Sequence, residues 1–113
     1  NNSVMFGSLS GTKLGVWVAH GEGKFEFPYE EKEYNIIAKY NYDGYPANPN
    51  GSPWSVAGVC SKDGRHLAMM PHPERAIFPW QCGYSPADRK ENDEVTPWIE
   101  AFVNARKWIE NNK

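Results

Sequence analysis

The stretch that decides the fold runs from residue 56 to residue 75 and reads VAGVCSKDGRHLAMMPHPER. It holds two apolar segments, residues 56–60 and 66–70, which are separated by a polar connection containing Asp63-Gly64. Asp-Gly between two apolar runs is one of the strongest local signals for a β-hairpin, because glycine tolerates the backbone conformation of the turn. We therefore predict two antiparallel strands that lead directly into a proline-rich segment.

His72 and Glu74 lie in that segment, where Pro71 and Pro73 flank the histidine. Proline restricts its own φ and biases the residue before it away from helix, so an extended backbone is predicted here. In an extended backbone, residues i and i+2 face the same side, which places His72 next to Glu74. An imidazole exchanges protons near neutral pH, and a carboxylate can orient it, so the pair predicts a general base with its orienting group. A surface or structural role is the alternative, because His-x-Glu also occurs by chance.

Four further segments carry patterns of regular structure. Residues 14–19 form a short apolar run that predicts a buried strand, and residues 24–27 alternate as in a half-exposed strand. Acidic residues behind a proline in residues 28–33 predict the first turn of a short helix, and residues 36–40 have the composition of a strand.

The remaining chain predicts a long loop and a C-terminal helix. Residues 41–54 are rich in Asn, Gly and Pro, which is typical of a series of turns with either a functional or a plain connecting role. Thr96-Pro97 predicts a helix start, with threonine as the N-cap and proline at the first helical position. The apolar residues that follow recur at helical spacing and predict one buried stripe: Trp98, Ala101, Phe102, Ala105, Trp108 and Ile109.

Length and composition set the broad class. The chain has 113 residues, of which 40% are hydrophobic and 23% charged, as expected for one globular domain or a portion of one. Its net charge of −2 gives no reason to expect a nucleic-acid partner, and no apolar run approaches the roughly 20 residues that span a bilayer. We therefore expect a cytoplasmic protein without a membrane partner. Its five tryptophans indicate either a large buried area or a surface that packs against something else.

The sequence predicts neither a metal site nor a cysteine nucleophile. His72-Pro73-Glu74 matches the first half of the zinc deaminase signature, but the Pro-Cys-x-x-Cys half is absent, so metal catalysis is disfavoured. Cys60 lies in a predicted strand, where a buried structural thiol is expected. Cys82 precedes a glycine but lacks the strand-to-helix elbow of a nucleophile, and His66 is expected at the surface.

His20 and Gly21 form a second candidate site. Gly21 and Gly23 follow the histidine closely, and glycines allow backbone amides to approach a ligand. The alternative is a turn that needs a positive φ. The residues themselves leave both interpretations open.

Four motifs in a fixed order resemble the C-terminal end of the phosphoribosylformylglycinamidine synthase family, and they cover nearly the whole chain. They are VAHGEG at 18–23, PANPNGSP at 46–53, MMPHPER at 69–75, and the tail from Pro97-Trp98 to Asn104-Ala105-Arg106. The second motif and the tail resemble the large single-chain form rather than the small separate glutaminase subunit.

The resemblance implies a class I glutamine amidotransferase domain with a flavodoxin-like α/β sandwich. Residues 1–113 would be the C-terminal half of this domain, including its β-hairpin and C-terminal helix. A Cys-His-Glu triad in this family hydrolyses glutamine, and the resemblance assigns the base to His72 and the orienting carboxylate to Glu74. It also implies a structural ion pair for Arg75 and a place beside the glutamine pocket for His20 and Gly21.

The resemblance also implies what must come from elsewhere. The cysteine nucleophile and the amides of the oxyanion hole would lie upstream in the parent chain, so the isolated chain is predicted to be inactive. Ammonia would pass to a synthetase region that binds ATP and magnesium, and no cofactor is expected in this chain. The parent would be a ligase of purine biosynthesis that converts formylglycinamide ribonucleotide to formylglycinamidine ribonucleotide.

A different class of function remains open. The chain could be a non-catalytic interaction module with a vestigial His72–Glu74 pair, in which the tryptophans mark a docking face. An upstream segment with a small-x-Cys-x-Gly elbow would decide for the enzyme.

Overall fold

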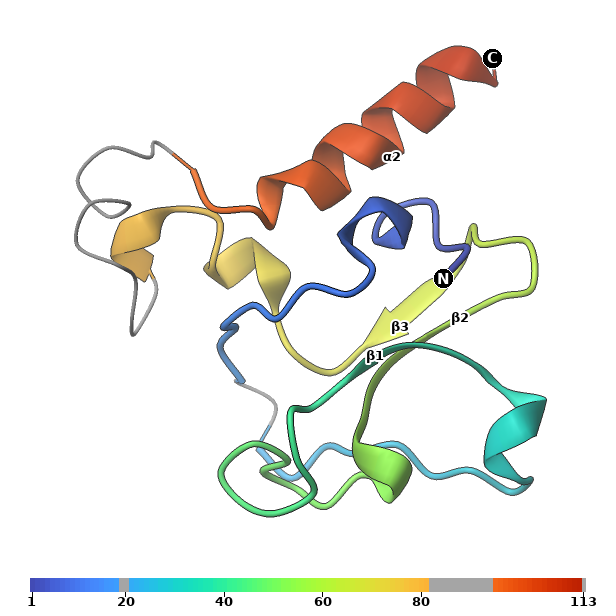
Figure 1. The fold of residues 1–113 in the computed structure, drawn as a ribbon, viewed down its shortest axis with the longest axis vertical. Coiled ribbons are helices and arrows are strands. Elements are labelled where there is room, and N and C mark those ends of the chain that lie inside the picture. Colours follow the sequence, from blue (N-terminus) through green and yellow to red (C-terminus); the bar gives the residue numbers. More distant parts are fainter. Residues whose placement is uncertain (19–20, 82–94, 113) are drawn as a thin grey trace. The chain divides into compact units, whose positions relative to one another are not determined.

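The computed structural model describes residues 1–18, 21–81 and 95–112. The chain divides into two compact units. Residues Asn1–Ser3 and His20–Met70 form the first, here called the sheet unit, and residues Val4–Ala19 and Pro71–Lys113 form the second, the helix unit. Figure 1 follows the chain through both units from its N-terminus to its C-terminus.

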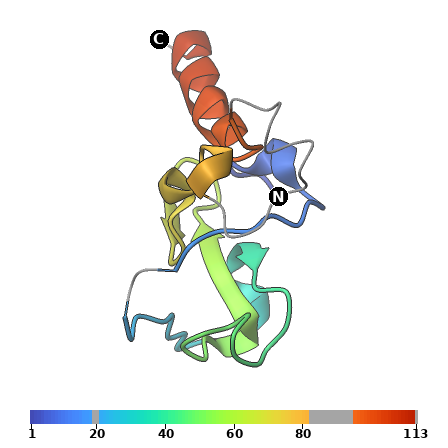
Figure 2. The ribbon, with the colours of Figure 1, turned by 90° about the vertical axis from the view of Figure 1, so that its left-hand side faces the viewer.

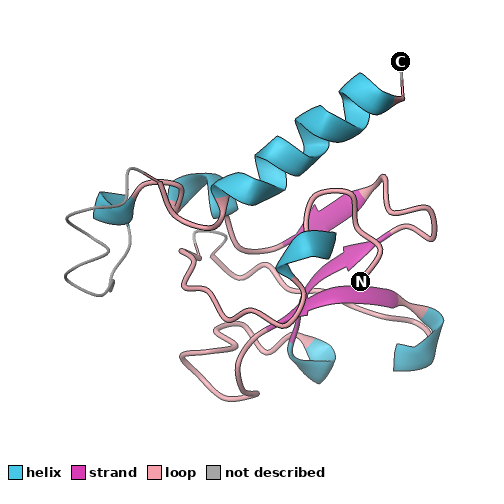
Figure 3. Cartoon of the chain, turned by 45° about the horizontal axis from the view of Figure 1, so that its top comes forward, coloured by secondary structure: helices cyan, strands magenta, loops and turns pink. Residues whose placement is uncertain are grey.

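The sheet unit contains a three-stranded antiparallel sheet in the order β1-β2-β3 (Figure 3). Its strands are β1 (Asn35–Lys39), β2 (Val56–Cys60) and β3 (Leu67–Met69). The hairpin predicted from Asp63-Gly64 is therefore confirmed, and so is the strand predicted over residues 36–40. Together with the C-terminal helix described below, this sheet makes the chain a small α/β structure, as predicted in outline.

The hairpin turn requires glycine at position 64. Gly64 has a φ of 77°, and its N–H donates to the carbonyl oxygen of Ser61 at 3.0 Å. A Cβ built on Gly64 would lie 2.1 Å from the carbonyl oxygen of Asn2, a backbone atom that cannot move aside easily. Asp63 completes the turn by accepting hydrogen bonds from Ser61 Oγ and from the Arg65 N–H. The local signal therefore reflects a real steric demand.

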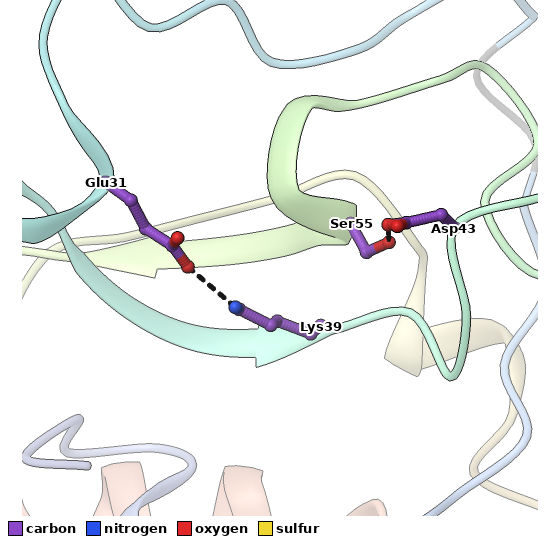
Figure 4. Close-up of polar contacts among 4 residues, drawn as sticks. All are labelled: Glu31, Lys39, Asp43 and Ser55. Atoms are coloured by element: carbon purple, nitrogen blue, oxygen red, sulfur yellow. Dashed lines mark hydrogen bonds and ion pairs between the residues drawn. The ribbon is translucent and has the colours of Figure 1, made fainter.

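Two short 3-10 helices flank the strands of the sheet unit, η2 (Glu31–Glu33) and η3 (Pro53–Ser55). The first lies within the predicted short helix, and the second ends the predicted loop over residues 41–54. Figure 4 shows one polar contact at each of these two short helices. Lys39 Nζ pairs with Glu31 Oε1 of η2 at 2.7 Å, and Ser55 Oγ of η3 donates to Asp43 Oδ1. Both contacts join a short helix to a polar residue close by in the fold.

Residues 24–27 do not form the predicted strand. Their exposure does alternate, because Phe25 and Phe27 are half-buried while Lys24 and Glu26 are exposed. Phe25 and Phe27 stack at 5.5 Å between ring centroids, and Phe27 stacks on Trp54 at 5.1 Å. The segment lies beside a loop instead of a strand, so alternation is present without a β-ladder.

The described residues of the helix unit include a long helix, α2 (Ile99–Asn111), and three 3-10 turns. Those turns are η1 (Gly7–Leu9), η4 (Pro73–Arg75) and η5 (Pro79–Gln81). Phe6 and Trp98 meet edge to face at 5.9 Å, and both are buried. The indole N–H of Trp98 donates to the carbonyl oxygen of Gly15 at 2.8 Å. Figure 2 gives a second view of the same ribbon, turned by 90°.

The strand predicted over residues 14–19 is wrong for its described part, residues 14–18, which carry no regular structure. Trp17 and Val18 are exposed. The carbonyl oxygens of Gly15 and Trp17 accept hydrogen bonds from the Trp98 indole and the His72 N–H, both in the helix unit. An apolar run alone does not make a strand when no other strand pairs with it. Ala19 lies outside the described residues.

α2 begins at Ile99, three residues after the predicted cap. Thr96 does not cap it, because Thr96 Oγ1 donates to the carbonyl oxygen of Ala76 at 2.5 Å. The predicted stripe is buried only at its N-terminal end, at Trp98 and Ala101. Phe102 and Ile109 are exposed, so the predicted stripe lies against a core at its N-terminal end and not along its whole length.

In the described ranges, no helix combines the length and the apolar character needed to cross a membrane.

Candidate active site

His72 and Glu74 lie side by side, as predicted. His72 Nδ1 is 2.6 Å from Glu74 Oε1. Both side chains remain accessible, with 36% of the histidine and 55% of the glutamate exposed. The pair is therefore formed within this chain and is open to a reacting group from outside it.

The backbone brings them together differently from the prediction. The extended run predicted here is wrong for residues 73–75, because Pro73–Arg75 is the 3-10 helix η4, with Pro73 at its first position. The carbonyl oxygen of His72 accepts from the Arg75 N–H at 3.0 Å, so His72 is the cap that opens the turn. The φ that proline imposes also suits the first residue of a helical turn, and Pro73 takes that position here.

The main chain of His72 is anchored at one further point in the helix unit. Its N–H donates to the carbonyl oxygen of Trp17 at 3.1 Å. The Trp17 indole in turn donates to the carbonyl oxygen of Gln81, in η5. Pro71 and Pro73 on either side of the histidine are buried. A rigid backbone thus presents an accessible imidazole.

The electrostatics of the pair decide which ring nitrogen carries the proton. The hydrogen bond from His72 lowers the pKa of Glu74, and the glutamate's own backbone N–H lowers it further. Glu74 is therefore a carboxylate at neutral pH, and a carboxylate can only accept hydrogen bonds. Nδ1 of His72 must donate, which leaves Nε2 as the acceptor. This is the arrangement of a general base with a positioned orienting group.

The expected ion pair of Arg75 is absent among the described residues. Arg75 is exposed, and its charge makes only the smallest of the contributions that lower the pKa of Glu74. His72 is therefore the main support for the Glu74 carboxylate.

The described residues of the helix unit contain no cysteine that could act as the nucleophile. Cys60 lies in β2 of the sheet unit as a free thiol and is half-buried, less enclosed than predicted. Cys82 lies outside the described residues. His66 is exposed, as predicted. Among the described residues, no group of three or more His, Cys, Asp or Glu side chains could hold a metal ion.

The second candidate site falls in the sheet unit and is described only in part. His20 lies outside the described residues. Gly21 has a φ of 58°, so the turn with positive φ that the sequence left open is present. The carbonyl oxygens of Gly21 and Gly23 both accept from Asn50 Nδ2, at 2.6 and 2.9 Å. The sequence predicts the loop that contains Asn50, but no local pattern indicates that Asn50 bonds to Gly21 and Gly23.

A surface hollow of about 510 Å³ also lies in the sheet unit. Pro28, Tyr29, Lys32 and Trp54 are among the residues that line it, and it contains none of the predicted site residues. The accessible His72–Glu74 pair therefore remains the stronger candidate for chemistry.

Comparison with known proteins shows the family of this chain. Residues 1–109 match the model of the CobB/CobQ-like glutamine amidotransferase domain. The chain belongs to this family. The matched range includes both candidate sites.

Three curated relatives of this chain carry closely related names. Phosphoribosylformylglycinamidine synthase of Homo sapiens is 45% identical over 94% of the chain. A probable chloroplastic/mitochondrial phosphoribosylformylglycinamidine synthase of Arabidopsis thaliana and the phosphoribosylformylglycinamidine synthase of Drosophila melanogaster are each 43% identical over 96% of it. The chain spans only 9% of the length of each of these relatives. The resemblance predicted from the four motifs is confirmed.

Proposed function

We propose that this chain is the C-terminal part of the glutaminase domain of a phosphoribosylformylglycinamidine synthase. The parent ligase would use glutamine and ATP to convert formylglycinamide ribonucleotide to formylglycinamidine ribonucleotide in purine biosynthesis. The observation that carries the proposal is the accessible His72–Glu74 pair, 2.6 Å apart, in a chain of the glutamine amidotransferase family.

The missing parts of the machinery are assigned to the rest of the parent chain. It would supply the cysteine nucleophile, the oxyanion hole, and a synthetase region that binds ATP and magnesium. The complete domain would be a class I flavodoxin-like sandwich, to which this chain contributes its hairpin and C-terminal helix. We place the enzyme in the cytoplasm.

The chemistry follows from the free Nε2 of His72. This nitrogen would take the proton of the incoming thiol, and the thiolate would attack the side-chain amide carbon of glutamine. The C–N bond then breaks, and the imidazolium returns the proton to the departing ammonia. Water would next attack the resulting thioester with His72 again as the base, which releases glutamate and the free thiol.

Glu74 would hold the imidazole through both steps. As a carboxylate bonded to Nδ1, it stabilises the imidazolium and prevents the ring from turning Nε2 away from sulfur. His20 and Gly21 would line the glutamine pocket, with the backbone at Gly21 close to the substrate.

The test uses the full-length protein that contains this chain. His72→Ala removes the base, so the glutamine-dependent rate should fall by a factor of about 10³ or more. The rate with free ammonia bypasses the glutaminase and should stay within about twofold of wild type. His66→Ala is the matched control, because His66 is an exposed histidine of the hairpin, and it should change neither rate.

Two results would contradict the proposal. Loss of both rates in His72→Ala would assign the histidine a structural role for the whole enzyme. An unchanged glutamine-dependent rate would favour a non-catalytic interaction module. Trp98 would not belong to its docking face, because it is buried against Phe6.

A further inference from the structure

The segment from Gly21 to Phe25 is held by a loop instead of a sheet. Asn50 Nδ2 donates to the carbonyl oxygens of Gly21 and Gly23. The N–H of Phe25 donates to Ser52 Oγ at 3.3 Å. Figure 1 shows this segment, in light blue, running beside the green loop that contains Asn50 and Ser52. The position of the segment is therefore set by side chains that lie 27 to 29 residues away in sequence.

The loop that provides these side chains is itself closed. Asn48 Nδ2 donates to the carbonyl oxygen of Ser52 at 2.9 Å, and the Ser52 N–H returns a hydrogen bond to Asn48 Oδ1 at 3.0 Å. Both residues are about 5% exposed. Gly51, with a φ of 74°, allows the chain to turn between them. A buried, mutually bonded pair makes a stiff support on which the half-buried Asn50 is mounted.

The chemistry at position 50 is specific to an amide. A single NH₂ group carries two hydrogens, and here it serves two carbonyl oxygens that belong to one tight turn. Aspartate has nearly the same shape but no donor, and it would place a carboxylate against two carbonyl oxygens. Alanine would leave both carbonyls without this partner.

We propose that Asn50 is a positioning residue for glutamine binding. By fixing the carbonyl groups of Gly21 and Gly23, it sets the backbone of the turn that faces the substrate amino acid. This inference rests on the proposed function, which places Gly21 beside the glutamine pocket. Asn50 acts through the turn and does not itself react.

The kinetic test uses Asn50→Asp and Asn50→Ala in the full-length protein. Loss of the two hydrogen bonds should raise the KM for glutamine by about tenfold, while kcat falls by less than about threefold. Asn35→Asp is the matched control, because Asn35 Nδ2 also serves two oxygens, Asn2 Oδ1 and the carbonyl oxygen of Ser61, in the same unit. It should leave the KM for glutamine within about twofold of wild type.

A second readout does not depend on activity. Hydrogen exchange should quicken in the peptide covering residues 21–27 in both Asn50 variants, and it should stay unchanged in β2 and β3. Exchange that rises equally in the strands would show general destabilisation and overturn a positioning role. Unchanged exchange in residues 21–27 would overturn the inference whatever the kinetics.

The two proposals can fail separately. If His72→Ala abolishes glutamine use while Asn50→Asp keeps the wild-type KM, the proposed function stands and the role of Asn50 is overturned. If His72→Ala retains glutamine use, the proposed function fails, and with it the assignment of the Gly21 turn to a glutamine pocket.

Discussion

The contacts inside the sheet unit differ in kind from the contacts inside the helix unit. In the sheet unit, backbone groups pair along three antiparallel strands, and a tight turn joins two of them. In the helix unit, several long-range hydrogen bonds come from side chains that reach a backbone carbonyl, such as Trp98 to Gly15 and Asn104 to Met5. The three strands of the sheet unit are therefore held by backbone pairing, whereas α2 of the helix unit is held to earlier segments of the chain by a few large or polar side chains.

This difference also bears on the two candidate sites. His72 lies in the helix unit, where its N–H meets the carbonyl oxygen of Trp17, and its partner Glu74 is two residues away. The Gly21 turn lies in the sheet unit and accepts a hydrogen bond from Asn50, in a loop that is distant in sequence. The orientation of the base is therefore set by residues close in sequence, whereas the Gly21 turn is held by a residue 29 positions away.

The largest effect is expected from removing the central side chain of the helix unit. Trp98→Ala deletes a buried ring that packs on Phe6 and donates to the carbonyl oxygen of Gly15. Such truncations cost about 3–5 kcal/mol, and the opening free energy of the helix unit, measured by hydrogen exchange in the full-length protein, should fall by this amount. Trp80→Ala is the control, because Trp80 is 73% exposed, and its cost should stay below about 1 kcal/mol. Equal costs would contradict the distinction between these tryptophans.

A smaller effect is expected from a backbone change in the sheet unit. Gly64→Ala places a Cβ against the carbonyl oxygen of Asn2 at a positive φ and should destabilise the β2–β3 hairpin by about 2 kcal/mol. Gly44→Ala lies in the same unit, with open space around the new Cβ and no positive φ, and should be nearly neutral. Hydrogen exchange of β2 and β3 measures the stability of the hairpin in both variants. A neutral Gly64→Ala would show that the turn can relax, against the argument that backbone conformation limits this unit.

The smallest effect concerns the charge of Glu74. Its pKa is lowered in the folded state, so its ionised form contributes to stability above the ordinary value of 4.5, and that contribution is lost as pH falls through the lower folded pKa. We expect carboxyl NMR to show Glu74 titrating below 4.5 in the wild type and at higher pH in His72→Ala. His66→Ala should leave the titration unchanged, because His66 is not among the groups that lower this pKa. The same Glu74 titration in His72→Ala and wild type would show that the pair is not the cause.

Local signals predicted a substantial part of the fold and of the site. Asp63-Gly64 predicted the hairpin because the steric demand of the turn arises within a few residues. His72 and Glu74 were predicted as neighbours because they are two residues apart, although the turn that joins them is 3-10 and not extended. Their catalytic roles remain predictions.

The misplaced elements share one physical cause. Residues 14–18 and 24–27 have the apolar content or the alternation of strands, but a strand also needs a partner along its edge. Their partners here are an indole, a backbone N–H and a serine hydroxyl. Nothing within either segment indicates such partners. The exposed Phe102 and Ile109 make a similar point, since helical spacing indicates a face but not what covers it.

The sequence by itself determined the hairpin, the C-terminal helix and the adjacency of His72 to Glu74, because the forces that produce them act between residues close in the chain. Only the tertiary structure decided how the Gly15 and Gly21 segments are held. Their carbonyl oxygens find donors 83 and 29 residues away, at Trp98 and Asn50. A backbone oxygen accepts from any donor that folding brings within reach, so its partner cannot be known until the chain has folded.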